Sequence, residues 1–309
     1  MSSDHVRRAA AFAPGHVTGI FAPRTDARDP RERGSVGAGV VLELGVRALV
    51  VHRPAGPRRL RVTGDVARSL GISLEVARRL TATVPGSVTV HLRHDLPIGQ
   101  GFGTSAAGAT ATALALSRLV GHPRADALAT AHLADLFGGG GLGGVAAILG
   151  GGLEVRVRPG VPPWGEVRHA PFGPPFLVGV VGDPIPSPDV LRDPRRLRRV
   201  AEACSGWERL VADPSPATFF ALSERFTDRA GLAGPRLRAV LRGLRRTNTR
   251  AAQAMFGGSF VALPEGPAAR RAAVDWLARF GVRAVEVRAA RRGARVLGPA
   301  ATARPPQSF

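Results

Sequence analysis

Three glycines alternate in the segment PIGQGFGTSAA, and two hydroxyl residues follow them directly. Gly99, Gly101 and Gly103 lack a Cβ atom, so the backbone at these positions can approach a ligand closely. Thr104 and Ser105 lie where an alanine-rich helix is expected to begin. The first N–H groups of a helix are unpaired and lie at its positive dipole end, which favours anions. The segment therefore predicts phosphate binding by backbone N–H groups, with a hydroxyl group available to Mg²⁺ or to a phosphate oxygen.

The elements expected around this segment place it between a strand and a helix. Residues 87–93 alternate apolar and polar as a half-buried strand does, and residues 104–120 form the alanine-rich helix. A second helix is expected at 124–137 and, after a glycine-rich crossing, a strand at 153–158. A tight strand-to-helix turn would also explain alternating glycines, so the segment alone leaves both interpretations open.

Strands and helices are interleaved along the rest of the chain, which indicates an α+β or α/β class. Further strands are expected at 7–13 (ending at Pro14-Gly15), 37–52, 58–63, 176–181 and 283–288. Further helices are expected at 65–83 (broken near Gly71), 192–203, 216–230, 235–246 and 267–280. We expect residues 58–63 to pair with 37–52, and the segment AAQAMFGGSFVALP to turn from a helix into a strand. Residues 159–175 are rich in proline and glycine and mark the expected domain boundary.

The composition excludes several chemistries. The 309 residues carry a formal charge of +20, from 43 basic and 23 acidic side chains, and every basic one is arginine. Because the sequence has no lysine, a Schiff-base lysine, a Walker A lysine and a protein-kinase strand lysine are impossible. The single cysteine, Cys204, excludes an internal disulfide and a multi-cysteine metal site.

The positive charge has two interpretations. Arginine runs such as RDPRRLRR are typical of nucleic-acid binding, and equally of solvated helix faces. Replacement of every lysine by arginine indicates a bias spread over the whole chain, and aromatic residues for base stacking are scarce at 5% with no tyrosine. We therefore expect no nucleic-acid partner, while the charge favours anionic small ligands. The sequence shows no signal-like or membrane-length apolar stretch, so we expect a cytoplasmic protein without a membrane partner.

The pattern P-x-G-x-G-x-G-T-S-A-A resembles the phosphate loop of the GHMP kinases, the superfamily of galactokinase, homoserine kinase and mevalonate kinase. The segments AFAPGHVTGIFAP and GSVGAGVVLELGV, near the N-terminus, are similar to the signature of the archaeal pantoate kinases. Residues 131–165 and 254–263 resemble later segments of these proteins in the same order. The resemblance implies an α+β, two-domain GHMP kinase fold: a ribosomal-S5-like nucleotide-binding domain at 1–165 and a ferredoxin-like domain at 166–309.

The same resemblance implies an activity and its cofactors. It implies ATP-dependent phosphorylation of the 4-hydroxyl group of pantoate, an archaeal step toward coenzyme A, with ATP and Mg²⁺ as cofactors. A homodimer is plausible on the same ground. The positions that match the ATP-binding loop are Pro97, Gly99, Gly101, Gly103, Thr104, Ser105 and Ala106.

The resemblance also assigns roles to five side chains. Ser105 and Asp135 match catalytic and metal-binding positions, while Ser35, His132 and Arg156 match positions near pantoate. An arginine on a strand suits the carboxylate of pantoate, and residues three apart on a helix share a face. Alternatives remain open for four of them. His132 would be bonded to a carbonyl, Asp135 would be a solvated helix-end acid, Arg156 would lie on the outer face of its strand, and Ser35 would form a turn.

Two departures from the family pattern concern the reaction centre. Where the family has TGLGDV this chain has GGLGGV, so that Gly144 stands in place of an aspartate that orients or deprotonates the attacking hydroxyl. Asp135 is one methylene shorter than the usual glutamate. Loss of a general base typically costs about 10²–10⁴-fold in rate, which leaves room for a slow kinase. The alternatives are a non-catalytic or weakly active binding protein on this fold, or a GHMP kinase for another small hydroxy acid.

Overall fold

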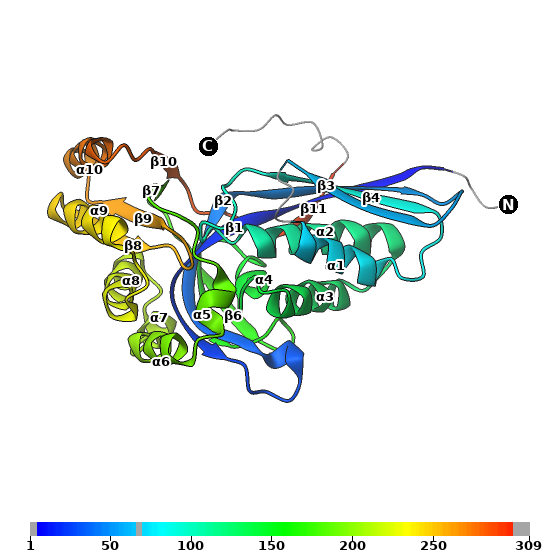
Figure 1. The fold of residues 1–309 in the computed structure, drawn as a ribbon, viewed down its shortest axis with the longest axis horizontal. Coiled ribbons are helices and arrows are strands. Elements are labelled where there is room, and N and C mark those ends of the chain that lie inside the picture. The colour runs from blue at the N-terminus through cyan, green and yellow to red at the C-terminus, as the bar shows by residue number, and fades with distance from the viewer. Residues whose placement is uncertain (1–4, 66–69, 299–309) are drawn as a thin grey trace.

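The computed structural model describes residues 5–65 and 70–298. Two β-sheets, each packed against helices, form the two lobes that Figure 1 shows on its right and left sides. The right-hand lobe contains a seven-stranded sheet and the left-hand lobe a four-stranded one. The two longest strands, β1 (Arg7–Arg24) and β2 (Gly34–Arg53), run from the first lobe toward the second.

The first sheet has the order β11-β1-β2-β4-β3, with β5 on β2 and β6 on β5. Its other strands are β3 (Arg59–Gly64), β4 (Ser87–His94), β5 (Leu153–Arg158), β6 (Glu166–Ala170) and β11 (Arg295–Leu297). One edge of β2 pairs with β5 through residues 37–40 and with β4 through residues 46–53. After β4 the chain stays against β2 and β1, because the backbone N–H of Asp95 donates to the carbonyl oxygen of Gly45 and that of His16 donates to the carbonyl oxygen of Phe102.

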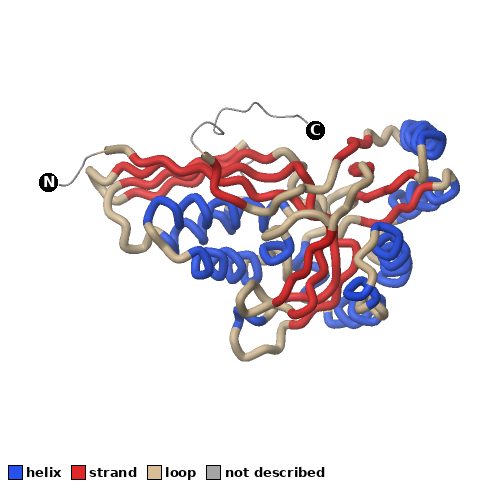
Figure 2. The backbone as a smooth tube through the Cα atoms, turned by 180° about the vertical axis from the view of Figure 1, so that it is seen from behind, coloured by secondary structure: helices blue, strands red, loops and turns tan. Residues whose placement is uncertain are grey.

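Helices pack on one face of the first sheet, as the view from behind in Figure 2 also shows. They are α1 (Gly71–Leu80), α2 (Thr104–Val120), α3 (Arg124–Phe137) and the short α4 (Gly144–Ala147). Helix α2 is apolar on almost every side and is buried from Thr104 to Leu116 except at Ser105. Its many alanines let β1, β2, α1 and α3 approach it closely, so the start of α2 is held firmly.

The second sheet is antiparallel in the order β10-β7-β9-β8. Its strands are β7 (Phe176–Val180), β8 (Thr249–Gln253), β9 (Ser259–Pro264) and β10 (Ala284–Val287). The remaining helices are α5 (Ser187–Leu191), α6 (Pro194–Ala203), α7 (Arg209–Ala212), α8 (Pro216–Ala230), α9 (Pro235–Arg246), α10 (Pro267–Arg279) and the 3₁₀ helix Pro30–Glu32. Helices α6 and α8 each have a proline in the first turn, and the side chain of the residue before it, Asp193 in α6 and Ser215 in α8, caps the helix.

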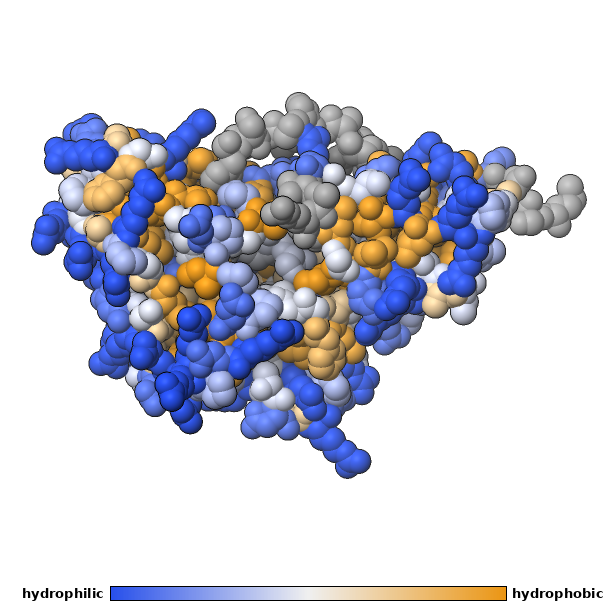
Figure 3. Space-filling model, in the orientation of Figure 1, coloured by the Kyte–Doolittle hydropathy of each residue, from blue (hydrophilic) through white to orange (hydrophobic). Residues whose placement is uncertain are grey.

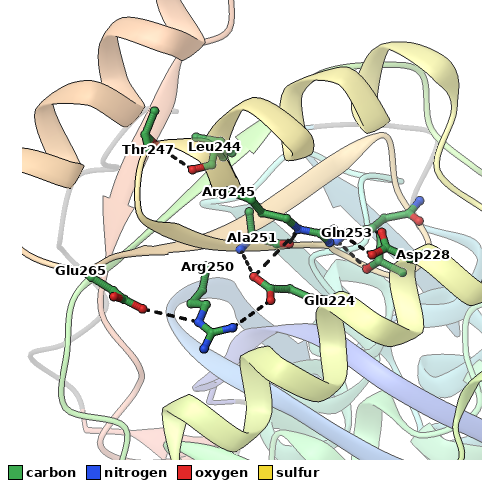
Figure 4. Close-up of polar contacts among 10 residues, drawn as sticks. Glu224, Asp228, Leu244, Arg245, Thr247, Arg250, Ala251, Gln253 and Glu265 are labelled. Carbon is green, nitrogen blue, oxygen red and sulfur yellow. Dashed lines mark hydrogen bonds and ion pairs between the residues drawn. The ribbon is translucent and has the colours of Figure 1, made fainter.

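A polar network ties β8 to α8 and α9 (Figure 4). The carboxylate of Glu224 accepts hydrogen bonds from the backbone N–H of Ala251 at 2.9 Å and from Nη1 of Arg250 at 3.1 Å. Nη1 of Arg245 donates to both carboxylate oxygens of Asp228, at 3.0 and 2.8 Å. These contacts fix β8, the strand that leads into the segment facing the first lobe.

Most expected elements are confirmed, some to the residue. The helices at 104–120, 124–137, 216–230 and 235–246 and the strand at 153–158 have the expected bounds. The helix expected over 65–83 is confirmed only as α1, and residues 66–69 lie outside the described residues. The elements that were not expected are β6, β11, α4, α5, α7 and the 3₁₀ helix.

Three expectations were wrong, each because a non-local contact decides the outcome. Strand β1 continues past Pro14-Gly15 to Arg24, since a register shift between Pro14 and His16 accommodates the break. Strand β3 pairs in parallel with β4, and β2 is not its neighbour. Residues 249–253 are a strand because they pair with β9. In addition, β6 and β11 join the first sheet although both follow residue 165.

The arginine runs lie on exposed helix faces. Arg195, Arg196, Arg198 and Arg199 of α6 are exposed, as are the arginines at 236, 238, 242 and 246 of α9. Figure 3 shows hydrophilic side chains along the rim of the left-hand lobe, where these helices lie. Within the described ranges, no helix has the length and apolar character needed to cross a bilayer.

Cys204 is buried directly after α6, and burial raises the pKa of its thiol to about 12. At about pH 8 only about one thiol in ten thousand would be ionised, and it is shielded from reagents. We expect the folded protein to resist a thiol-specific reagent such as dithionitrobenzoate, and one equivalent to react after unfolding in guanidinium. Rapid stoichiometric reaction of the folded protein would contradict this burial.

Candidate active site

A cavity of about 660 Å³ lies at the start of α2. The glycine-rich loop at 98–106 and a second glycine segment at 138–144 form two of its walls. Side chains of β1, β2 and β5 line it from the first sheet. Residues 184–188, together with Met255 and Phe256, close it from the second half of the chain. The cavity therefore lies between the two lobes.

The loop before α2 has the backbone conformation that only glycine adopts easily. Gly99, Gly101 and Gly103 all have positive φ, at +77°, +75° and +65°. Gly103 is the N-cap of α2 and provides no side-chain cap, so the first N–H groups of the helix have no capping acceptor. A ligand with anionic oxygens is the partner that such a helix start favours.

Residues of the second half hold this loop in place. Nε2 of Gln100 donates to the carbonyl oxygen of Gly182 at 3.1 Å, and Oγ of Ser259 donates to the carbonyl oxygen of Gln100. A Cβ atom on Gly101 would lie 2.6 Å from the carbonyl oxygen of Ala254, so only glycine fits there. The anion site thus depends on both lobes.

Ser105 and Asp135 face each other at one end of the cavity. Oγ of Ser105 donates to Oδ1 of Asp135 at 2.5 Å, and Asp135 is only 2% exposed. Burial raises the pKa of the Asp135 carboxyl to about 7, against the opposing hydrogen bonds from Ser105 and from the backbone of Gly141. Asp135 is therefore a buried acid, which excludes the solvated helix-end alternative.

This pair fits a magnesium ion better than a softer metal. A hydroxyl and a carboxylate are hard oxygen ligands, and Mg²⁺ usually takes one or two carboxylates together with phosphate oxygens and water. A divalent cation would also favour the charged form of the carboxylate that burial disfavours. Among the described residues, no group of three or more His, Cys, Asp and Glu side chains could hold a metal by itself. Phosphate oxygens would have to complete the coordination.

Arg156 lies at another wall of the same cavity. The register pairs Arg156 with Gly37 and Gly37 with Phe21, so these residues form one row across three strands and share a face of the sheet. Ser35 lies two residues before Gly37 on β2 and is buried on the same face. Arg156 is 2% exposed, and its Nε, also buried, has no hydrogen-bond partner. An unpaired buried guanidinium N–H indicates a site for an anionic group.

The glycine segment at 138–144 lies against both Asp135 and Arg156. A Cβ atom on Gly140 would lie 1.9 Å from Oδ1 of Asp135, and one on Gly143 would lie 2.8 Å from Nε of Arg156. Side chains at these positions would displace both groups. Asp135 and Arg156 can therefore face a common space only because residues 140 and 143 are glycines.

A buried hydrogen-bonded pair beside the cavity, His16 and Glu154, was not predicted. Nε2 of His16 lies 2.8 Å from Oε1 of Glu154, and Nη1 of Arg156 donates to the same oxygen. Burial lowers the pKa of His16 from its usual value, with the hydrogen bond to Glu154 acting in the opposite direction. The sequence gives one signal that could have found this pair: Glu154 stands on the same face of β5 as Arg156.

Two expected residues lie elsewhere. His132 does not line the cavity: it is buried on α3 with Nε2 2.9 Å from the carbonyl oxygen of Arg33. This is the carbonyl-bonded alternative, and the place of His132 near pantoate stays a prediction. Pro97 is also absent from the lining, which begins at Ile98. The other expected residues, Ser35, Gly99, Gly101, Gly103, Thr104, Ser105, Ala106, Asp135 and Arg156, all line this one cavity.

Gly144 begins α4 in a crowded place. A Cβ atom there would lie 2.6 Å from Cβ of Ala106 and 3.8 Å from Oδ2 of Asp135. The chain thus pairs a glycine at 144 with an alanine on α2 that leaves no room for a larger residue.

We expect Gly144→Asp to lower the free energy of unfolding by about 1–3 kcal/mol, because the new side chain overpacks against α2. Ala106→Gly should recover part of this loss when combined with it. Chemical denaturation of the wild type, both single variants and the double variant measures the effect. A Gly144→Asp protein as stable as the wild type would contradict the crowding seen here.

Comparison with known proteins gives a consistent result. The family described as GHMP kinases N terminal domain matches residues 68–152. A pantoate kinase of Thermococcus kodakarensis is 33% identical over 243 residues, which are 76% of this chain and 80% of that protein. A pantoate kinase of Methanospirillum hungatei is 28% identical over 261 residues, 83% of this chain and 87% of that protein.

Solved structures agree with the fold. A structure described as a phosphotransferase related to the CoA biosynthesis pathway has a TM-score of 0.84 and 28% identity, over 94% of this chain and 98% of that chain. A homoserine kinase from Cytophaga hutchinsonii has a TM-score of 0.65 at 17% identity, over 96% and 98%, which shows the fold alone.

The two-sheet architecture and the glycine-rich loop at the start of α2 are those of a GHMP kinase. Within that class, the chain belongs to the pantoate kinase family.

Proposed function

We propose that this protein phosphorylates the 4-hydroxyl group of pantoate with ATP and releases ADP, on the route to coenzyme A. One observation carries the proposal: the helix start of α2 and Arg156, whose Nε–H has no hydrogen-bond partner, line a single cavity. A kinase for a small hydroxy acid needs these two sites together, one for the triphosphate and one for the carboxylate.

The nucleotide end is formed by the loop before α2. The free first-turn N–H groups of α2 would bind phosphate oxygens, and Gly99, Gly101 and Gly103 let the backbone approach them. Ser105 and Asp135 would hold Mg²⁺ between them and the phosphates. When bound, that ion neutralises charge on the phosphoryl group that is transferred.

The acid end is formed by the first sheet. Arg156 would bind the carboxylate through the side of its guanidinium that Glu154 leaves free, and Ser35 lies beside it. Apolar surface faces the same space: the rings of Phe21 and Phe256 pack edge to face with centroids 5.3 Å apart. This surface suits the two methyl groups that distinguish pantoate from a linear hydroxy acid.

The chemistry then needs positioning more than covalent participation. The 4-hydroxyl oxygen forms a bond to the γ-phosphorus, the bond from that phosphorus to the β,γ-bridging oxygen breaks with its electrons leaving on ADP, and the hydroxyl proton passes to a group in the cavity or to water. Phosphoryl transfer passes through a loose transition state, so orientation and charge stabilisation supply most of the rate. The cavity provides both without the aspartate that Gly144 replaces.

The test is ADP release by the purified protein with ATP and Mg²⁺, with pantoate, homoserine or mevalonate as acceptor. We expect ADP formation that depends on pantoate and is slower with the other two. Absence of pantoate-dependent ADP at high enzyme concentration would contradict the proposal, and faster turnover of homoserine or mevalonate would reassign the acceptor.

The glycine at position 144 favours a second candidate, a binding protein that turns over little. Calorimetric titration separates the two. Binding of ATP or pantoate without any turnover would support this candidate, whereas binding with pantoate-dependent ADP release excludes it.

A further inference from the structure

His16 lies at the point where the two ends of the cavity meet. It lines the cavity, and its backbone N–H donates to the carbonyl oxygen of Phe102 in the phosphate loop at 2.9 Å. A Cβ atom on Gly103 would lie 3.2 Å from the backbone and Cβ of His16, so the histidine sits directly against the N-cap of α2. Its ring reaches Glu154, which in turn holds Arg156.

The ring of His16 is oriented by its neighbours. Nε2 points across β2 toward Glu154, and Gly39 makes this possible because a Cβ atom there would lie 2.2 Å from Nε2. A carboxylate only accepts hydrogen bonds, so Nε2 donates and Nδ1 keeps a lone pair. Oγ1 of Thr18 lies 3.4 Å from Nδ1, and this distance is longer than that of an ordinary hydrogen bond. Thr18 also lines the cavity.

The other ionisable groups that line the cavity each have a partner in the site. Among the described residues that line the cavity, the ionisable side chains are His16, Asp135 and Arg156. An arginine does not give up its proton, and Asp135 accepts the hydrogen bond of Ser105 and is assigned to the nucleotide end. The position where the family places an aspartate is Gly144.

We propose that Nδ1 of His16 accepts the proton of the acceptor hydroxyl during phosphoryl transfer, with Glu154 as its orienting partner. This inference rests on the proposed function. The hydroxyl O–H bond breaks as its oxygen bonds to the γ-phosphorus, the proton goes to Nδ1, and ADP leaves with the electrons of the broken P–O bond. The resulting imidazolium keeps its hydrogen bond to Glu154, whose carboxylate it shares with Arg156, and the carboxylate of pantoate at Arg156 adds a second negative charge nearby.

His16→Gln tests this role directly. The amide N–H of glutamine can replace the hydrogen bond from Nε2 to Glu154, but glutamine cannot accept a proton. We expect kcat with pantoate to fall by about 10²–10⁴-fold, while the KM values for ATP and pantoate stay unchanged. The matched control is His52→Gln, which removes another buried histidine, one whose Nε2 lies 2.8 Å from the carbonyl oxygen of Pro85, away from the cavity. The control should keep the wild-type kcat.

Each outcome has a distinct meaning. A His16→Gln protein with the wild-type kcat would overturn the role of His16 while the proposed function stands. A rise in the KM for pantoate with unchanged kcat would also overturn it, because His16 would then act only through Arg156. A wild type without pantoate-dependent ADP release would overturn the proposed function itself. If His16→Gln fails to fold, His16→Asn takes its place in the same kinetic comparison: a kcat lower by about 10²-fold or more supports the role of His16, and a wild-type kcat overturns it.

Discussion

Asp135→Asn is expected to lower kcat for pantoate by about 10²–10³-fold, the loss typical when one preorganised electrostatic group is removed from a reaction centre. Asparagine has nearly the same shape as aspartate, and its side-chain oxygen can still accept the hydrogen bond from Ser105. The substitution therefore removes only the negative charge that would hold Mg²⁺. We also expect the Mg²⁺ concentration needed for half-maximal rate to rise. Steady-state kinetics over a range of Mg²⁺ concentrations measures both effects.

The unfolding temperature of Asp135→Asn distinguishes a loss of catalysis from a folding defect. Burial already disfavours the charged carboxyl of Asp135, so the neutral variant should unfold at the same temperature as the wild type or higher. Asp126→Asn is the matched control, because Asp126 is exposed in the first turn of the same helix. An Asp135→Asn protein with the wild-type kcat would remove Asp135 from the nucleotide end of the site.

Replacement of Arg156 is expected to raise the KM for pantoate by about 10²-fold or more, since a charge-assisted hydrogen bond contributes about 1.5–3 kcal/mol and the guanidinium offers more than one. Arg156→Lys tests geometry because lysine keeps the charge and loses the planar fork. We expect the KM for ATP to stay unchanged, because the proposed site for the triphosphate is at the start of α2. Kinetics with each substrate varied in turn gives the result.

Variants of Arg156 also affect its buried partner, Glu154. Removing the arginine alone leaves Glu154 buried with an uncompensated charge, which typically costs about 3–5 kcal/mol of stability. The double variant Arg156→Gln/Glu154→Gln removes both charges and should fold better than Arg156→Gln. Arg158→Gln, on the exposed end of the same strand, is the control. A wild-type KM for pantoate in Arg156→Lys and in the double variant would contradict the assignment.

The parts of the fold that the sequence predicts well are those with local causes. Helix α2 ends at Val120, and Gly121 after it adopts the positive φ that is typical of a helix C-terminus. The alternating glycines before it are explained by three positive φ angles. Prolines in the first turn place the starts of α8 and α9. In each case the residues that determine the boundary are neighbours in the chain.

The parts that could not be predicted depend on distant partners. Strand β8 reads as a helix until its pairing with β9 is known. His16 and Glu154 are 138 residues apart, and their contact requires both the register shift in β1 and the glycine at position 39. The location of His132 depends on the carbonyl oxygen of Arg33, 99 residues earlier. Residue types alone do not reveal which of two histidines faces the cavity.

The central claim is that one cavity holds the phosphoryl donor at the start of α2 and the carboxylate of the acceptor at Arg156. The position of the new phosphate on pantoate tests it most directly. Phosphorus–proton correlation spectroscopy of the purified product should show the phosphorus coupled to the methylene protons at C4, because the carboxylate end is held away from the nucleotide. Coupling to the single proton at C2 would mean that the acid binds in the opposite sense, and no phosphate ester at all would contradict the account.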